Sequence, residues 1–244
     1  TMGYDHLPVV KKLKIGIIST GDELKSPGEP LSFGEIYESN SYGLSGLVEA
    51  LGHTPIRYPA VIDSLSELRA QFNEAATECD LFLTSGGVSM GEYDFVRKIM
   101  EEEGDLHFWR MKIRPGSPPL FGLWNATPLF GLPGNPISSA ACCRFFVYPY
   151  LLKLLGIKSE KPVKAILKND FIKKKNFTRF AKSKLSTTKN GKIEVEILKG
   201  QESFRIKSFV KSNIWTLLPA GKSKFKKGQI VDCFFPNHIN QSLI

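Results

Sequence analysis

Three acidic side chains stand just after apolar segments that are typical of β-strands. Glu23 follows the segment 14–19, Asp63 follows 54–61, and Asp94 lies nine residues beyond Ser85, which ends a third segment at 80–85. Parallel strands place their carboxyl ends along one edge of a sheet, where ligands of α/β proteins bind. Carboxylate oxygens are the donors that Mg²⁺ prefers. We therefore expect these three side chains to form a metal site, although each one alone is typical of a protein surface.

Loops rich in glycine follow the same strands and suit a phosphate-bearing ligand. One is Ser85-Gly86-Gly87-Val88-Ser89, whose glycines would let main-chain N–H groups approach an anion. Another is Leu132-Pro133-Gly134-Asn135-Pro136, which opens a helix with an asparagine N-cap and a proline at the first position. The first strand is followed by Thr20-Gly21-Asp22. A tight turn and helix capping explain the first two loops without any ligand, so both interpretations stay open.

Two arginines near a fourth apolar segment suggest an anion site. Arg110 and Arg114 are four residues apart, just before Pro115-Gly116. Their forked guanidinium groups would bind an oxyanion or a phosphate through paired hydrogen bonds. The alternative is that both charges simply flank an exposed strand end. From residue types and spacing alone, the sequence predicts a phosphate-bearing ligand together with a divalent cation.

The elements that must position these residues alternate between strands and helices up to residue 157. Apolar residues at helical spacing, with capping residues, predict helices near 40–51, 64–76, 93–103 and 136–155. Further short strands are expected at 106–111, 119–123 and 128–132. This alternation predicts an α/β domain over residues 1–157, built as a three-layer sandwich around a mainly parallel sheet.

The remainder of the chain, residues 158–244, differs in charge and in pattern. It holds 20 basic and 6 acidic residues, a net charge of +14, whereas residues 1–157 hold 13 and 18, a net charge of −5. Alternation of apolar and charged residues at 193–197 indicates a half-buried strand, and four more strands are expected, with no convincing helix. These features predict a small all-β, barrel-like domain over 158–244.

Several common classes of function find no support in the sequence. The motifs of P-loop proteins, dinucleotide-binding folds, zinc proteases and serine hydrolases are missing, and the histidines and cysteines show no ligand spacing. No apolar segment approaches the ~18–20 residues of a membrane span, and the first residues do not resemble a signal peptide. We expect a cytoplasmic protein with buried free thiols, and the start at Thr1-Met2 suggests a fragment.

Four of these segments, in this order and at this spacing, resemble the molybdopterin molybdotransferase family, whose animal counterpart is the E domain of gephyrin. They are Ser19-Thr20-Gly21-Asp22-Glu23-Leu24, the segment from Ser85 to Asp94, the segment from Phe108 to Gly116, and Leu132-Pro133-Gly134-Asn135-Pro136. The resemblance covers residues 12–244. It implies Mg²⁺-assisted insertion of molybdate into adenylylated molybdopterin, with release of AMP. It also implies a homodimer, in which a region that precedes this segment in family members completes the partner's cleft.

Carried over by position, the resemblance assigns catalysis to Glu23, Asp63, Asp94, Arg110 and Arg114. The three carboxylates are also the implied metal ligands. Arg110 and Arg114 stand where the family often has lysines, Ser117 stands where a lysine is common, and Glu38 stands where an aspartate is usual. Ligand binding is assigned to a larger set: Thr20, Gly21, Asp22, Ser85, Gly86, Gly87, Ser89, Pro133, Gly134, Asn135, Lys182 and Ser203.

Alternative functions stay open at this point. The related molybdopterin adenylyltransferase shares the α/β fold and the glycine loop, but the C-terminal β domain argues against it. A non-catalytic binding or scaffold role is conceivable, since the gephyrin relative also acts as a scaffold. The lysines of the basic domain are dispersed and no nucleic-acid-binding motif accompanies them. We therefore expect small-molecule partners, and neither nucleic acid nor membrane.

Overall fold

A six-stranded sheet forms the centre of the first part of the molecule. The computed structural model describes residues 3–7, 9–89, 91 and 94–236. The strand order is β4-β1-β5-β9-β8-β6, with bounds β1 (Lys14–Ser19), β4 (Thr54–Arg57), β5 (Leu81–Ser85), β6 (Asp105–Trp109), β8 (Leu120–Trp124) and β9 (Thr127–Leu132). Strands β4, β1, β5 and β9 run parallel, whereas β8 and β6 are antiparallel to their neighbours. The prediction of a mainly parallel sheet is confirmed.

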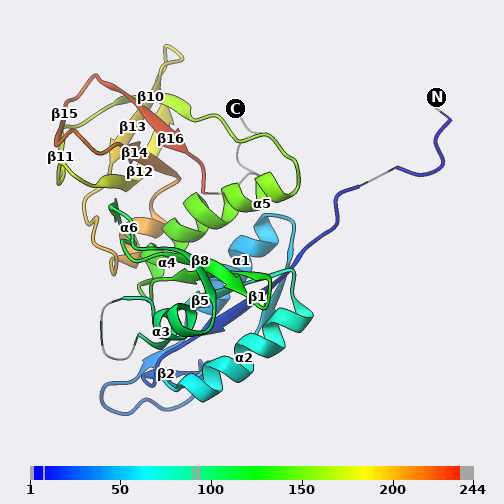
Figure 1. The fold of residues 1–244 in the computed structure, drawn as a ribbon. Helices are drawn as coiled ribbons and strands as arrows, with labels where there is room; N and C mark the ends of the chain where they lie inside the picture. The colour runs from blue at the N-terminus through cyan, green and yellow to red at the C-terminus, as the bar shows by residue number, and fades with distance from the viewer. Residues whose placement is uncertain (1–2, 8, 90, 92–93, 237–244) are drawn as a thin grey trace.

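Helices cover both faces of this sheet, which confirms the three layers (Figure 1). Helix α1 (Asn40–Ala50) lies on one face beside α4 (Pro136–Cys142), the π-helical segment η1 (Cys143–Val147) and α5 (Tyr148–Leu154). On the opposite face, α2 (Leu65–Glu78) and α3 (Phe95–Glu102) bury Phe72 and Val96 against Phe82 of the sheet. Burial of these apolar stripes holds the strands at one level and so fixes where their carboxyl ends meet.

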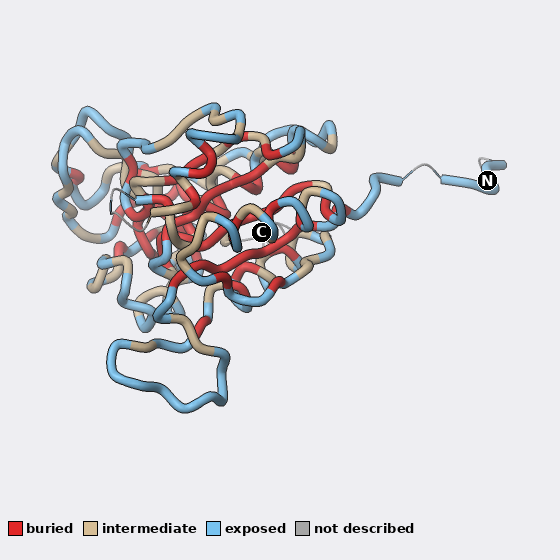
Figure 2. Tube along the Cα trace, turned by 60° about the horizontal axis from the view of Figure 1, so that its bottom comes forward, coloured by how far each residue is buried: buried red, intermediate tan, exposed pale blue. Residues whose placement is uncertain are grey.

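The second part is a closed five-stranded barrel, as the sequence predicted. Its order is β13-β10-β16-β14-β12, and an additional pairing of β12 with β13 closes the ring. The bounds are β10 (Val163–Leu167), β12 (Thr178–Thr187), β13 (Ile193–Ile197), β14 (Ile214–Leu218) and β16 (Ile230–Phe234). Strand β7 (Ile113–Arg114) comes from the α/β part and pairs in parallel with β12. Buried residues run through the middle of both parts (Figure 2).

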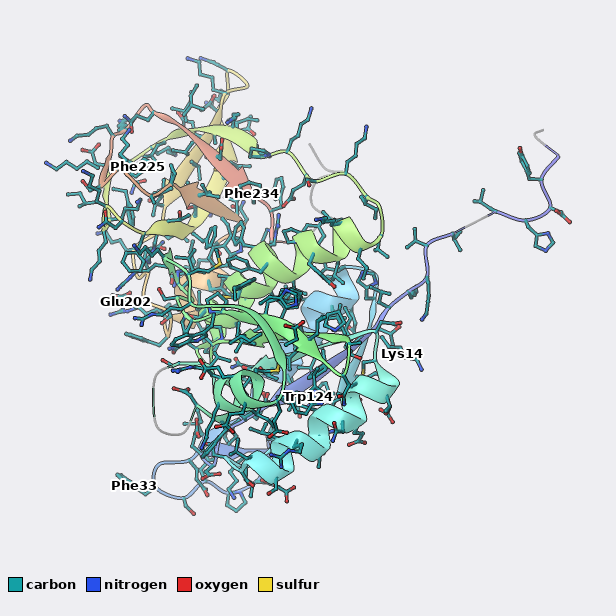
Figure 3. All side chains as sticks on the ribbon, viewed as in Figure 1. Lys14, Phe33, Trp124, Glu202, Phe225 and Phe234 are labelled. Carbon is teal, nitrogen blue, oxygen red and sulfur yellow. The ribbon has the colours of Figure 1, made fainter. Side chains whose placement is uncertain are left out.

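Short two-stranded ribbons complete the fold. Strands β2 (Leu24–Lys25) and β3 (Ile36–Tyr37) pair beside the sheet, and β11 (Phe171–Ile172) pairs with β15 (Lys224–Phe225) beside the barrel. The loop between β2 and β3 projects from the molecule, with Phe33 at its far end (Figure 3). Among the helices that the structure describes, none has the length and apolar character needed to cross a bilayer.

Local departures from the predicted elements have identifiable physical causes. A five-residue helix, α6 (Ile206–Val210), lies in the domain where no helix was expected, because so short a segment cannot show a helical repeat. The expected helix at 136–155 contains the π-helical segment η1 just before Pro149, whose nitrogen cannot donate a helical hydrogen bond. Ser39, rather than Asn40, precedes α1 as its N-cap. The domain boundary at residue 157 stays a prediction.

Candidate functional site

A cleft of about 670 Å³ lies at the carboxyl ends of β1, β5 and β9. The three strands end at one level, because Ser19 pairs with Ser85 and Ser85 pairs with Leu132. We call this space the carboxylate cleft. The predicted residues that line it come from the loops after these strands and from the loop holding Asp63: Thr20, Gly21, Glu23, Asp63, Ser85, Gly86, Gly87, Ser89, Asp94, Pro133, Gly134 and Asn135. Residues from four separate loops therefore meet where the sequence predicted.

Mutual repulsion among carboxylates marks the acidic side of this cleft. The pKa of Asp63 is raised, first by burial and then by the negative charges of Asp22, Glu23 and Asp94. Asp22 does not line the cleft; its carboxylate instead accepts the main-chain N–H of Asp63 at 2.9 Å and so supports that loop. A carboxylate that is ionised against this repulsion would gain from a nearby cation.

The donor set fits Mg²⁺ in chemistry but is not a ready-made cage. Among the residues that the structure describes, no group of three or more histidine, cysteine, aspartate or glutamate side chains is arranged to hold a metal ion. Mg²⁺ in phosphate-handling sites is commonly held by one or two carboxylates, with substrate phosphates and waters supplying the other ligands. Glu23, Asp63 and Asp94 around one cleft meet that smaller requirement.

The double glycine after β5 is required by the backbone and not only by a turn. Gly86 and Gly87 have φ values of 105° and 63°, in the left-handed range that side chains disfavour. A Cβ on Gly86 would lie 2.6 Å from the carbonyl oxygen of Thr20. The N–H of Gly86 is already donated to the carbonyl of Leu132 at 3.0 Å. Contacts from this loop to a ligand therefore fall to Gly87, Val88 and Ser89, which line the cleft.

The close approach at Gly86 gives a test of stability. We expect Gly86→Ala to lower the free energy of unfolding by about 1–3 kcal/mol, because it combines an unfavourable φ with a clash against rigid backbone. Gly28→Ala is the matched control, since Gly28 also has a positive φ of 98° but a Cβ added there would meet nothing within 4 Å. Equal losses of stability for the two variants in chemical denaturation would contradict the close approach.

Asn40 lines the carboxylate cleft and connects two of its loops. It was not among the predicted site residues. Its side-chain NH₂ donates to Ser85 Oγ at 2.7 Å and to the carbonyl of Gly134 at 2.6 Å. Ser139 Oγ donates to the carbonyl of Pro133, in the same loop as Gly134, at 2.6 Å. The sequence pattern indicated only a capping role for Asn40 at α1, and the tertiary fold is what brings it between two loops that are about 50 residues apart in sequence.

Glu38 also lines this cleft, and both oxygens of its carboxylate accept hydrogen bonds. It accepts hydrogen bonds from Ser19 Oγ at 2.8 Å, from the Ser41 N–H at 2.7 Å and from Ser41 Oγ at 2.7 Å. The side chain is buried. Glu38 therefore ties the end of β1 to the first turn of α1, and the extra methylene relative to an aspartate is accommodated within this network.

A second cleft, of about 630 Å³, lies between the α/β part and the barrel. Its described lining holds four cationic side chains, Arg114, Lys173, Lys174 and Arg179, against one carboxylate, Glu202. We call it the basic cleft. Predicted residue Ser203 also lines it, and Gly116 and Ser117 line both clefts. The two spaces therefore adjoin at Gly116-Ser117, with carboxylates on one side and cations on the other.

Like charges face one another in the basic cleft. The pKa of Arg179 is lowered, first by burial and then by the positive charge of Arg114. The Nε atom of Arg179 is buried without a hydrogen-bond partner in the described structure. An oxyanion bound here would offset the repulsion between the two guanidinium groups and would accept their hydrogen bonds.

Besides Asp22, two more predicted residues are absent from the described linings of both clefts. Arg110 has a φ of 70° and its N–H donates to the carbonyl of Pro119, but it is not among the described lining residues of either cleft. The barrel residue Arg179 is the register partner of Arg114, and a joint role of Arg110 and Arg114 at one anion stays a prediction. Lys182 is buried within the barrel, with its side chain only 1% exposed.

Comparisons with known proteins agree with this architecture. The model of a family described as a probable molybdopterin binding domain matches residues 16–153, more than half of the chain, and that of the MoeA C-terminal region (domain IV) matches 164–234. The chain is 34% identical over 242 residues to a molybdopterin molybdenumtransferase of Haemophilus influenzae, covering 98% of this chain and 60% of the relative. A relative of the same description from Bacillus subtilis is 33% identical over 245 residues, covering 99% and 57%.

A solved structure is similar over both parts of the chain. The molybdopterin biosynthesis moeA protein of Pyrococcus horikoshii superposes with a TM-score of 0.77 at 28% sequence identity, covering 93% of this chain and 55% of that one. The chain thus spans a little over half the length of the relatives that it matches.

Proposed function

The chain belongs to the family of the probable molybdopterin binding domain, and in its sequence this domain is followed by the MoeA C-terminal region. We propose that the chain is the substrate-holding part of a molybdopterin molybdenumtransferase. The reaction would insert molybdate into adenylylated molybdopterin and release AMP. One observation carries the proposal: a carboxylate cleft and a basic cleft adjoin at Gly116-Ser117. A nucleotide phosphate in the first and an oxyanion in the second would lie side by side.

The residues of the carboxylate cleft would hold the pyrophosphate of the adenylylated substrate. Main-chain N–H groups of the loop from Gly87 to Ser89 would donate to its oxygens. One or two of Glu23, Asp63 and Asp94 would hold a Mg²⁺ ion together with the phosphates. When bound, that ion would neutralise the phosphate charge and polarise the bond to the leaving AMP. Asn40 and Glu38 would keep the surrounding loops in place.

The residues of the basic cleft would hold molybdate, a tetrahedral dianion. Arg114 and Arg179 would each donate paired hydrogen bonds, and the Ser203 hydroxyl would donate a further one. Lys173 is held in place for a supporting role, because its ammonium donates to the carbonyl of Phe177 at 2.6 Å. The expected catalytic role of Arg110 has no comparable support, since it does not line this cleft in the described structure.

The direct test is to incubate this chain with adenylylated molybdopterin, Mg²⁺ and molybdate and to measure AMP. A second arm uses the Haemophilus influenzae relative with its matching segment replaced by this chain, because the relatives are longer. We expect AMP release that depends on molybdate. Absence of molybdate-dependent release in both arms would refute the proposal, and ATP-dependent adenylylation of molybdopterin would favour an adenylyltransferase instead. A homodimer and a cytoplasmic location also stay predictions.

Arg114 offers a separate binding test. We expect Arg114→Ala to weaken molybdate binding at least about tenfold, because charge-assisted hydrogen bonds contribute roughly 1.5–3 kcal/mol each. Isothermal titration with molybdate measures this. Lys168→Ala is a suitable control, since Lys168 belongs to the barrel but not to the described lining of the cleft. Wild-type affinity in the Arg114 variant would mean that molybdate binds elsewhere.

A further inference from the structure

The buried lysine of the barrel makes its hydrogen bonds to main chain, not to the cleft. Lys182 lies on β12, and its ammonium donates to the carbonyl of Glu202 at 3.0 Å and to the carbonyl of Arg205 at 3.2 Å. Burial, followed by the nearby charge of Arg179, lowers the pKa of Lys182 to about 8. A buried amine is costly to fold unless its donors are satisfied, so both carbonyl contacts matter to this residue.

The segment that receives these hydrogen bonds is tied to β12 at further points. The side-chain NH₂ of Gln201 donates to the carbonyl of Lys182 at 2.7 Å and to that of Leu198 at 2.8 Å. The N–H of Lys182 donates back to Gln201 Oε1 at 3.0 Å. Arg179 donates to the carbonyl of Gln201 at 2.6 Å. Lys182 and Gln201 therefore hold the turn between residues 198 and 205 against the barrel from two sides.

This turn forms one wall of the basic cleft. Gln201, Glu202, Ser203 and Phe204 all line that cleft, as does Arg114. Glu202 lies at the junction between the barrel and the α/β part (Figure 3). Its carboxylate pairs with Arg205 at 3.3 Å, so the carbonyls, and not the carboxylate, are what Lys182 holds. Ser203 therefore lies in a turn whose main chain is held partly by Lys182, a residue outside the described lining of the cleft.

We propose that Lys182 is a positioning residue, which sets the place of Ser203 in the basic cleft and thereby the affinity of that cleft for a tetrahedral oxyanion. The family resemblance assigned Lys182 to the ligand; the hydrogen bonds assign it to the loop behind the ligand. The inference rests on the proposed function only in taking the basic cleft as an oxyanion site. Its effect passes through main-chain geometry, so it should be local to residues 198–206.

Molybdate binding by this chain, together with hydrogen exchange, tests the inference. We expect Lys182→Met to bind molybdate about tenfold more weakly, from the loss of two hydrogen bonds of a charged donor. Amide exchange should become faster in 198–206 and stay unchanged in β10 and β16. Lys184→Met is the matched control, because Lys184 lies on the same strand but is exposed. Gln201→Ala loosens the same turn without removing the buried amine and should reproduce both effects. Because Gln201 itself lines the cleft, the faster amide exchange in 198–206 is the readout that decides the question if Lys182→Met fails to fold.

A double-mutant cycle separates positioning from a merely structural role. If Lys182 acts through Ser203, Lys182→Met/Ser203→Ala should bind molybdate no more weakly than Lys182→Met, within about twofold. The inference would be overturned if the losses of molybdate affinity of the two single variants multiplied in the double variant. It would also be overturned if affinity and amide exchange were unchanged in both Lys182→Met and Gln201→Ala. Failure of the proposed function looks different: Arg114→Ala and Ser203→Ala would then bind molybdate like the unmodified chain.

Discussion

Asp63→Asn and Asp94→Asn should each reduce molybdate-dependent AMP release at least about 100-fold. A bound metal ion stabilises the charge that develops on a phosphate group in the transition state by several kcal/mol. The substitution keeps the size of each side chain but removes the charge that a cation needs. Asp63 is the more informative position. Its pKa is raised by burial and by the charges of Asp22, Glu23 and Asp94, so in the absence of metal its ionised form destabilises the folded protein.

The direction of the Asp63 pKa shift makes the expected loss of activity distinguishable from a loss of folding. With a raised pKa in the folded state, Asp63 lowers stability at neutral pH, and that cost disappears as the pH falls through the folded pKa. Asp63→Asn removes the same charge, so its melting temperature without Mg²⁺ should equal or exceed that of the unmodified chain. Added Mg²⁺ should no longer raise it.

Asp105→Asn is the control for both measurements, because its side chain is 72% exposed and it does not line either described cleft. We expect this variant to keep its turnover and its response to Mg²⁺. If Asp63→Asn and Asp94→Asn released AMP at the unmodified rate, these carboxylates would be ordinary surface groups. A lower melting temperature of Asp63→Asn without Mg²⁺ would contradict the repulsion in the carboxylate cleft.

The carboxylate cleft could be predicted from sequence because its parts are local. Each strand of the parallel sheet is a short apolar segment, and the loop that follows it carries the functional residue within a few positions. Once β1, β5 and β9 are placed side by side, Glu23, Gly87 and Gly134 must meet. The pattern of apolar segments therefore contained most of the information for this half of the site.

The basic cleft could not be found in this way, because it depends on contacts between distant segments. Arg114 reaches the barrel only because β7 pairs with β12, which places it opposite Arg179 in the register. The two arginines are 65 residues apart, and no periodicity in the sequence predicts that β7 and β12 pair. The direction of Lys182 has the same origin: an alternating strand predicts which face a side chain occupies, but not that a turn from residues 198–205 covers that face.

Arg144 shows how the two parts are held in a fixed relation around the basic cleft. It lies in η1, and its Nε donates to the carbonyl of Phe235, just after the last barrel strand, at 2.6 Å. Its NH2 group pairs at 2.5 Å with Glu160 in the segment that joins the two parts, and the side chains are only 2% and 9% exposed. One guanidinium therefore connects the helix layer, the joining segment and the end of the barrel.

Arg144→Met should lower the free energy of unfolding by about 3–5 kcal/mol, because breaking a buried ion pair leaves the opposite charge buried and unpaired. For a chain of this size that corresponds to a fall in melting temperature of roughly 6–20 °C, which calorimetry measures.

The double variant Arg144→Met/Glu160→Gln should recover part of the loss, since it also removes the negative charge that Arg144→Met leaves buried and unpaired. Lys226→Met, which breaks an ion pair whose side chains are 67% and 54% exposed, should cost less than about 1 kcal/mol. Equal effects of Arg144→Met and Lys226→Met would mean that burial does not govern the Arg144 pair, and that the relation of the barrel to the sheet is fixed by apolar packing alone.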